Sequence, residues 1–89
     1  MISAASVVHY KIQIAASEKP ISLKDSRFAG IKDIADDKND KGIHRYVVGN
    51  YSDLQLCQNR LGSLKKKGFK DAFIVAYRDG KRVPLNQLP

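Results

Sequence analysis

The sequence predicts an α+β domain in which a four-stranded antiparallel sheet packs one face against two helices, the first of them short. Its length of 89 residues allows one small domain with one core. Segment 9–15 alternates apolar and polar side chains, as a strand with one buried face does, and segment 72–77 is almost wholly apolar. Residues 52–67 carry the apolar spacing of an amphipathic helix. Together the patterns predict the order strand, helix, strand, strand, helix, strand.

The first strand is predicted at His9 to Ala15. Alternation separates its side chains into two sets, with Tyr10, Ile12 and Ile14 on the buried face and Lys11, Gln13 and Ala15 on the other. The segment Glu18-Lys19-Pro20 then breaks the pattern. We therefore expect one half-buried strand at the start of the domain.

A short first helix is predicted from Ser22 to about Ala29. Ser22 is a candidate N-cap, because Asp25 follows it at the spacing of a weak capping box. Gly30 is expected to end the helix. The segment holds only two large apolar residues, so its helical pattern is weak.

The second and third strands are predicted to form a hairpin. The short strand Ile31 to Asp36 and the strand Ile43 to Val48 flank a polar turn, 37–42, that ends in glycine. Alternation in the third strand places His44, Tyr46 and Val48 on one face and Ile43, Arg45 and Val47 on the other. With Tyr46 directed inward, Arg45 is directed outward.

The second helix, predicted from Ser52 to Lys67, is the best defined element. Ser52 is the expected N-cap, and Gln55 completes a capping box. One apolar stripe follows, made of Leu54, Cys57, Leu61 and Leu64. Gly68 has the position of a left-handed C-cap residue, after which Phe69 is expected to pack back on the last turn.

The last strand is predicted at Ala72 to Tyr77, followed by the turn Asp79-Gly80. Residues 82–89 contain two prolines and are expected to form an extended tail or an edge segment. The predicted organisation is an N-terminal tail or linker at 1–8, a domain at 9–80 and a C-terminal tail at 81–89. The first eight residues are too short for a signal peptide, so an export signal is expected upstream or the protein is cytoplasmic.

This element order is the split βαβ, or ferredoxin-like, pattern. An antiparallel sheet of this kind can leave one face open to water. The side chains expected on that open face are Lys11, Gln13, Arg45, Val47, Phe73, Val75 and Tyr77. Exposed aromatic rings beside an amide and a guanidinium indicate a binding site. In the alternative interpretation, Phe73 and Tyr77 belong to the core or are covered by the C-terminal tail.

The charge balance is basic. Sixteen Lys and Arg residues against nine Asp and Glu residues give a net charge of +7. Such an excess favours an anionic partner, namely nucleic acid, an acidic lipid surface or an acidic polysaccharide, although solubility alone also explains it. No apolar run approaches the roughly 20 residues of a membrane-spanning helix. The single cysteine excludes an internal disulfide.

Residues able to carry catalysis or bind a metal have simpler explanations. His44 is expected to be a satisfied inner-face residue, and His9 is the other histidine. Cys57 lies on the apolar stripe and is expected to be a buried, inert thiol. The acidic residues Asp36, Asp37 and Asp40 are interpreted as solubilising charges, because they lack the glycine and glutamate of a calcium loop. We therefore expect no enzyme activity, no metal and no cofactor.

Two segments resemble the signatures of the SPOR (sporulation-related repeat) family. Residues Tyr10 to Ala16 are similar to its first strand, aromatic-x-Val-Gln-hydrophobic-Gly/Ala-Ser/Ala. Residues Arg45 to Tyr51 resemble its second signature, Tyr-Arg-Val-x-Val-Gly-Pro-Phe, and a helix, a glycine and an apolar strand follow as in the family. His44 stands where tyrosine is usual and Asn50 where proline is usual. The resemblance extends from Tyr10 to about Arg78.

SPOR domains bind bacterial peptidoglycan and prefer glycan strands stripped of stem peptides, which accumulate at division septa. The resemblance implies a ferredoxin-like, non-catalytic module of a larger envelope protein in the periplasm. It implies glycan contacts from Gln13, Arg45 and Phe73, while Lys11, Val47, Val75 and Tyr77 complete the expected surface. The family's serine falls on Ala16, and Ser17 is a candidate replacement. Arg45 is expected to bind the lactyl carboxylate that stem-peptide removal leaves on muramic acid.

Two alternative functions use the same surface. An RNA-recognition module shares the strand order and an aromatic sheet face. Its third strand, however, carries several aromatic residues and glycines, whereas residues 43–48 contain one tyrosine. A protein-interaction module that uses the apolar face or a sheet edge is the second alternative. The sequence therefore favours a glycan partner over nucleic acid.

Overall fold

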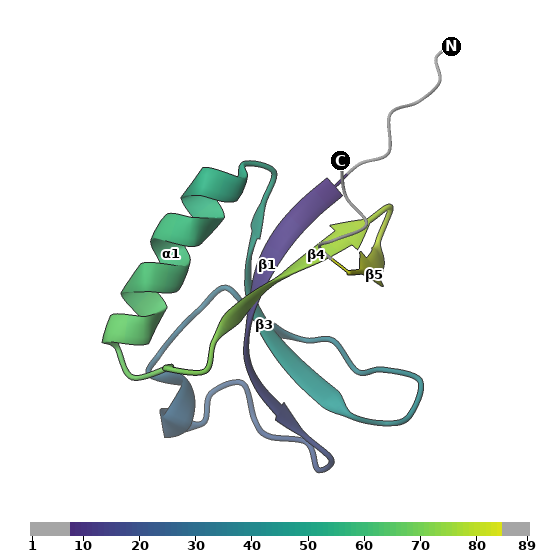
Figure 1. Cartoon of the computed structure of the whole chain (residues 1–89). Helices are drawn as coiled ribbons and strands as arrows, with labels where there is room; N and C mark the ends of the chain where they lie inside the picture. Colours follow the sequence, from purple (N-terminus) through teal and green to yellow (C-terminus); the bar gives the residue numbers. More distant parts are fainter. Residues whose placement is uncertain (1–7, 85–89) are drawn as a thin grey trace.

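The computed structural model describes residues 8–84. Their elements are β1 (Val8–Ser17), the 3-10 turn η1 (Ser26–Phe28), β2 (Ile34–Asp36), β3 (His44–Tyr51), α1 (Leu54–Lys66), β4 (Phe73–Arg78) and β5 (Lys81–Val83). The predicted α+β class with an antiparallel sheet is confirmed (Figure 1). Within the described residues the sheet has five strands and there is one α-helix, where the sequence predicts four strands and two helices.

The strands are ordered β2-β3-β1-β4-β5, and each neighbouring pair is antiparallel. β1 is the central strand, between β3 and β4 (Figure 1). Gln13 of β1 pairs with Val47 on one side and with Phe73 on the other. Because directly opposed residues share a face, these three side chains form one row across the sheet.

The core lies between the sheet and α1, which covers one face of the sheet (Figure 1). Its buried apolar residues come from the loop before β2, from the strands, from α1 and from the turn before β4; they are Ile12, Ile31, Val48, Cys57, Leu64 and Ala72. This matches the alternation expected for the first and third strands.

The predicted first helix is wrong. Only the three residues of η1 adopt helical geometry there, with Asp25 rather than Ser22 as the N-cap. Ala29 has a left-handed backbone with φ 53°, which ends the turn. The segment is held by tertiary contacts instead, because the buried ring of Phe28 lies 5.1 Å from the ring of Tyr46. A loop therefore covers the part of the sheet where a helix was expected.

The helix α1 begins one residue later than the sequence predicts. Asp53, not Ser52, is its N-cap, and the Asp53 carboxylate accepts the backbone N–H of Gln55 at 2.8 Å. A carboxylate at this position also interacts favourably with the partial positive charge at the N-terminal end of the helix. Of the predicted stripe, Cys57 and Leu64 are fully buried, while Leu54 is exposed.

The C-terminal end of α1 is confirmed. Gly68 has φ +116° and donates its N–H to the Lys65 carbonyl at 3.1 Å, while Phe69 donates its N–H to the Leu64 carbonyl at 3.1 Å. This pair of hydrogen bonds is the Schellman motif. Phe69 packs against the core cluster that contains Leu64, and so the end of the helix is fixed to the sheet.

The ends of the described chain extend the sheet. Lys81–Val83 pairs with β4 as the edge strand β5, so part of the predicted tail is an edge segment. Val8, which the sequence places in the N-terminal tail, is the first residue of β1. Residues 1–7 and 85–89 of the predicted tails lie outside the described residues. In residues 8–84, no helix has the length and apolar character needed to span a membrane.

Candidate functional site

The sheet face opposite α1 is here named the helix-free face. Its side chains alternate along the strands with those that enter the core. They are His9, Lys11, Gln13, Arg45, Val47, Phe73, Val75, Tyr77 and Arg82. The structure thus brings together every binding residue expected from the sequence except Ser17, and it adds His9 and Arg82.

A β-bulge moves Ser17 away from this face. The register of β1 against β3 shifts after Gln13. The pairs beyond the shift are Ala15 with Tyr46, Ala16 with Arg45 and Ser17 with His44. Because opposed residues share a face, Ser17 and Ala15 lie on the side that α1 covers. Ser17 therefore does not replace the hydroxyl missing at Ala16.

The helix-free face is less open than the sequence predicts. Val47, Val75 and Tyr77 are 1%, 5% and 7% exposed, whereas Phe73 is 46% exposed. A long polar side chain covers one of them, since the Lys11 Nζ atom lies 4.9 Å from the centre of the Tyr77 ring. The expected exposed patch of two aromatic rings and a valine is reduced to the single ring of Phe73.

Asp37 binds two residues of this face. Its carboxylate oxygen Oδ2 accepts a hydrogen bond from the Tyr77 hydroxyl and lies 3.0 Å from Nη2 of Arg45. Arg45 Nε also donates to the main-chain carbonyl of Asp37 at 2.9 Å. Burial and, next, the hydrogen bond to Asp37 raise the pKa of Tyr77 to about 12. The interpretation of Asp37 as a purely solubilising charge is therefore wrong, and two of the three nitrogens of the Arg45 guanidinium already pair with Asp37.

The neighbouring acid is also structural. Asp36 Oδ2 lies 2.5 Å from Nδ1 of His44, whose ring stacks at 6.4 Å from the ring of Tyr46. His44 is thus a satisfied residue of the covered face, as expected. Asp36 is exposed but held in this pair, so it is not simply a solubilising charge.

Three buried side-chain atoms in residues 8–84 have no hydrogen-bond partner: His9 Nδ1, Gln13 Oε1 and Arg82 Nη1. All three belong to the helix-free face. Buried polar atoms are nearly always paired, so a cluster of unpaired ones indicates a place where water or a ligand binds. Gln13, predicted as a glycan contact, is 9% exposed and directs an unpaired acceptor to this face.

Arg82 is the residue that the sequence reasoning missed. The turn Asp79-Gly80 between the apolar strand β4 and the segment Lys81–Val83 is a hairpin signal. Continuing the alternation across that turn places Arg82 opposite Tyr77, where the structure has it. The Asp-Gly pair is therefore the sequence signal that places Arg82 on this face.

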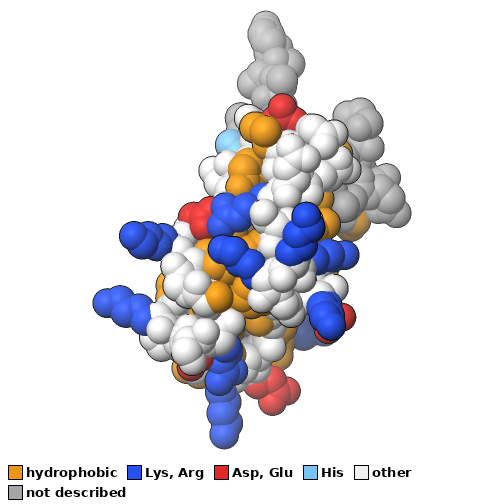
Figure 2. All heavy atoms as spheres, turned by 90° about the vertical axis from the view of Figure 1, so that its left-hand side faces the viewer, with side chains coloured by type: hydrophobic (Ala, Val, Ile, Leu, Met, Phe, Trp, Pro, Cys, Tyr) orange, Lys and Arg blue, Asp and Glu red, His pale blue; other side chains and the backbone are white. Residues whose placement is uncertain are grey.

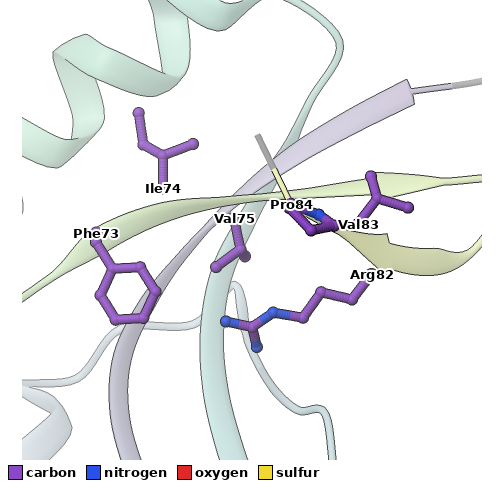
Figure 3. A pocket seen from close by; sticks show the side chains of 6 residues that line it. All are labelled: Phe73, Ile74, Val75, Arg82, Val83 and Pro84. Atoms are coloured by element: carbon purple, nitrogen blue, oxygen red, sulfur yellow. The ribbon is translucent and has the colours of Figure 1, made fainter. Parts of the chain in front are cut away.

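A groove lies at the edge of β4. Because β5 pairs only with Ala76–Arg78, no strand of the described residues lies beside the first half of β4 on the side away from β1. The groove there encloses about 340 Å³ and is lined by Phe73, Ile74, Val75, Arg82, Val83 and Pro84 (Figure 3). In Figure 3, Ile74 points to the α1 side, whereas Phe73 and Val75 point to the other side, and Arg82 runs back from β5 beneath Val75.

A second hollow of about 270 Å³ surrounds Tyr77. Its wall includes Lys11, Val47 and Asp37, together with His9. The helix-free face therefore has two adjacent depressions rather than one flat apolar surface.

The charges of the helix-free face are mostly positive. Lys11, Arg45 and Arg82 lie on it, and Asp37 is the acid that contacts it. Lys and Arg side chains are also spread over the face that carries α1 (Figure 2). The net charge of the chain is thus shared between both faces, and only the local arrangement supports a ligand site.

The single cysteine of the chain, Cys57, lies in the core. The thiol of Cys57 is fully buried, and burial raises its pKa to about 11, which keeps it protonated at neutral pH. Within residues 8–84, no cluster of three or more His, Cys, Asp or Glu side chains is arranged to hold a metal ion.

No protein-family model, curated protein or solved structure matches this chain.

Proposed function

We propose that the chain is a non-catalytic module that binds the glycan strands of peptidoglycan through its helix-free face. In this proposal it localises a larger envelope protein to the cell wall or division septum. The observation that carries it is the pairing of Gln13 with Phe73 across β1 and β4. An exposed aromatic ring lies beside a buried amide oxygen that has no partner. A sugar presents to such a pair the apolar face of its ring and a hydroxyl or acetamido donor.

The topology supports the proposal. Read from the other edge, the first four strands follow the order β4-β1-β3-β2, with α1 between β3 and β4. This is the strand order of the split βαβ arrangement, and we assign the fold to the ferredoxin-like group on that basis. The loop that contains η1 takes the place of the first helix, and β5 is an addition at the edge.

The charge of the face supports an acidic glycan over a neutral one. Three cationic side chains and one carboxylate leave a local excess of positive charge. Removing the stem peptides from muramic acid leaves one free lactyl carboxylate on every second sugar. A stripped strand is therefore a polyanion with a regular spacing, which suits a basic sheet face.

Sedimentation with purified sacculi tests the proposal. The chain should sediment with sacculi, and more of it after amidase treatment has removed the stem peptides. Phe73→Ala should weaken retention about fivefold, since one aromatic contact contributes on the order of 1 kcal/mol. Leu56→Ala is the matched control, because Leu56 is an exposed apolar side chain on α1. Retention that is absent, or equal for the wild type and Phe73→Ala, contradicts the proposal.

A fluorescence titration with single-stranded RNA separates the nucleic-acid alternative. Base stacking on an exposed aromatic ring and a basic face is the general way in which single strands bind. RNA binding that depends on Phe73, in a chain that does not sediment with sacculi, overturns the glycan proposal. RNA binding that falls steeply with salt and is equal in Phe73→Ala is non-specific and leaves it standing.

A further inference from the structure

Arg82 differs from the arginines that the structure holds in ion pairs. Arg27, Arg45 and Arg60 each contact a carboxylate, those of Asp25, Asp37 and Asp33 respectively. Arg82 Nη1 is buried and has no hydrogen-bond partner among the described residues. A guanidinium is always charged, and a buried N–H without an acceptor is unfavourable. The surroundings of Arg82 therefore leave this N–H without an acceptor, and a ligand is able to supply one.

The direction of the Arg82 side chain places this donor in the groove at the edge of β4. It runs from β5 beneath Val75 and toward the ring of Phe73 (Figure 3). On β1, the strand next to β4, the Gln13 side chain carries another unpaired buried oxygen of the same face. A guanidinium donor and an exposed ring thus line one groove, and an amide acceptor lies beside that ring on the adjacent strand β1.

Each part of the groove selects a feature of the ligand. The ring of Phe73 contacts the apolar face of a sugar ring. The planar fork of Arg82 matches a carboxylate better than a neutral hydroxyl. Arg45 has the same chemistry, but Asp37 occupies its Nε through the main-chain carbonyl and its Nη2 through the carboxylate.

We propose that the groove lined by Phe73, Val75 and Arg82 is the anion-binding subsite for a carboxylated sugar of the muramic acid type. In this subsite Arg82, and not Arg45, binds the lactyl carboxylate. The inference rests on the proposed glycan function and names the residue that reads the acid. The extra strand β5 is what supplies this residue to the face.

An NMR titration of the full chain with N-acetylmuramic acid and with N-acetylglucosamine tests the subsite. The two sugars differ by the lactyl carboxylate. N-acetylmuramic acid should bind about tenfold more tightly, since a hydrogen bond to a charged group contributes on the order of 1.5 kcal/mol or more. Its largest amide shifts should fall at residues 73–75, 82 and 83, which line the groove.

Arg82→Gln should remove the preference for the acid. Lys81→Gln is the matched control, because it removes the same charge from the neighbouring, exposed position of β5 and should keep the preference. A preference that survives in Arg82→Gln, or one that Arg45→Gln abolishes while Arg82→Gln does not, overturns the inference. If Arg82→Gln does not fold, Arg82→Lys carries the test. It should lower the preference about threefold through loss of the planar fork, and an unchanged preference contradicts the assignment.

The sacculus assay distinguishes the two proposals. Loss of retention in Phe73→Ala with full retention in Arg82→Gln supports the glycan function and overturns the subsite. An Arg82-dependent preference for N-acetylmuramic acid in a chain that does not sediment with sacculi supports the subsite and overturns the glycan function. Loss of both readouts in Arg82→Gln, with an unchanged melting temperature, supports both.

Discussion

Arg45 donates two hydrogen bonds to Asp37, from Nη2 to the carboxylate oxygen Oδ2 at 3.0 Å and from Nε to the main-chain carbonyl at 2.9 Å. They flank the turn between β2 and β3. Tyr77, 40 residues further along the chain, donates its hydroxyl to the same carboxylate. The arginine that the sequence assigns to a ligand is thus part of a clamp that joins the hairpin to β4.

Asp37→Asn should lower the free energy of unfolding by about 1–2 kcal/mol. The substitution removes the charge that Arg45 faces and leaves the buried Tyr77 hydroxyl with a weaker acceptor. Chemical denaturation measures the change. Asp40→Asn, at an exposed acid of the same turn, is the control and should have little effect. Equal stability of the two variants would show that the clamp contributes nothing.

Stability should decrease at high pH. The pKa of Tyr77 is raised from 10.0 to about 12 and that of Cys57 from 9.0 to about 11, in both cases first by burial. The unfolded chain therefore releases these protons at lower pH than the folded chain does. The stabilisation is complete below the unfolded pKa values and is lost as pH rises through the folded ones. Urea denaturation from pH 8 upward should show the decline, and Tyr77→Phe should reduce its slope between pH 10 and 12.

The ion pair between Arg60 and Asp33 should contribute modestly at neutral pH. Nη1 and Nη2 of Arg60 each lie 2.9 Å from a carboxylate oxygen of Asp33, and Nη1 also donates to the Tyr51 hydroxyl at 3.1 Å. Because Asp33 is about half exposed, Asp33→Asn should cost under about 1 kcal/mol. The effect should shrink in high salt. An effect of 3 kcal/mol or one that salt leaves unchanged would contradict this account.

The contribution of the Arg60–Asp33 ion pair to stability should decrease at low pH. The Arg60 guanidinium holds the pKa of Asp33 below its usual value of 3.8. The stabilisation is therefore present above pH 3.8 and is lost as pH falls through the lower folded pKa. Thermal melts of the wild type and Asp33→Asn should converge at low pH. Curves that stay parallel to the lowest pH would argue against the pair.

Two glycine substitutions should have opposite effects. Gly49 has φ +81°, and a Cβ there would lie 2.5 Å from the Cε2 atom of Tyr51, so Gly49→Ala should destabilise by about 1–3 kcal/mol. Gly62 lies within α1 with open space around it, so Gly62→Ala should stabilise by about 0.5–1 kcal/mol. Melting temperatures that move in the same direction would refute the explanation.

Gln13→Met should separate stability from binding. The substitution removes a buried amide oxygen that has no partner, so stability should stay equal or increase. Retention on amidase-treated sacculi should fall, because the acceptor for the sugar is lost. A large loss of stability would mean that Gln13 is a structural residue, and unchanged retention would remove it from the site.

The local patterns of the chain were sufficient for part of the fold and of the site. The alternation in the first strand, and in the last strand the small size of Ala72 and Ala76, predict that Gln13 and Phe73 lie on the face opposite the helix, as found. Gly68 and Phe69 predict how α1 ends. These features depend on backbone geometry and on neighbours within a few positions, so the sequence carries them directly.

Other features depend on distant segments. The weak helical pattern before Gly30 gives way to a loop, because Phe28 packs on Tyr46 of β3. The bulge after Gln13 arises only when β1 pairs with β3, and it moves Ser17 to the other face. The strand β5 exists through its pairing with β4. No local spacing encodes these pairings.

The sequence by itself determined which side chains of β1 up to Gln13 and of β4 share a face, since alternation is a property of each strand alone. Only the tertiary structure decided which of those side chains are available to a ligand. Val75 and Tyr77 are buried, Tyr77 under a long side chain from another strand, and Arg45 is paired with an acid from the preceding turn. Exposure and pairing depend on groups brought together by folding, and so Arg82 rather than Arg45 is left to receive an anion.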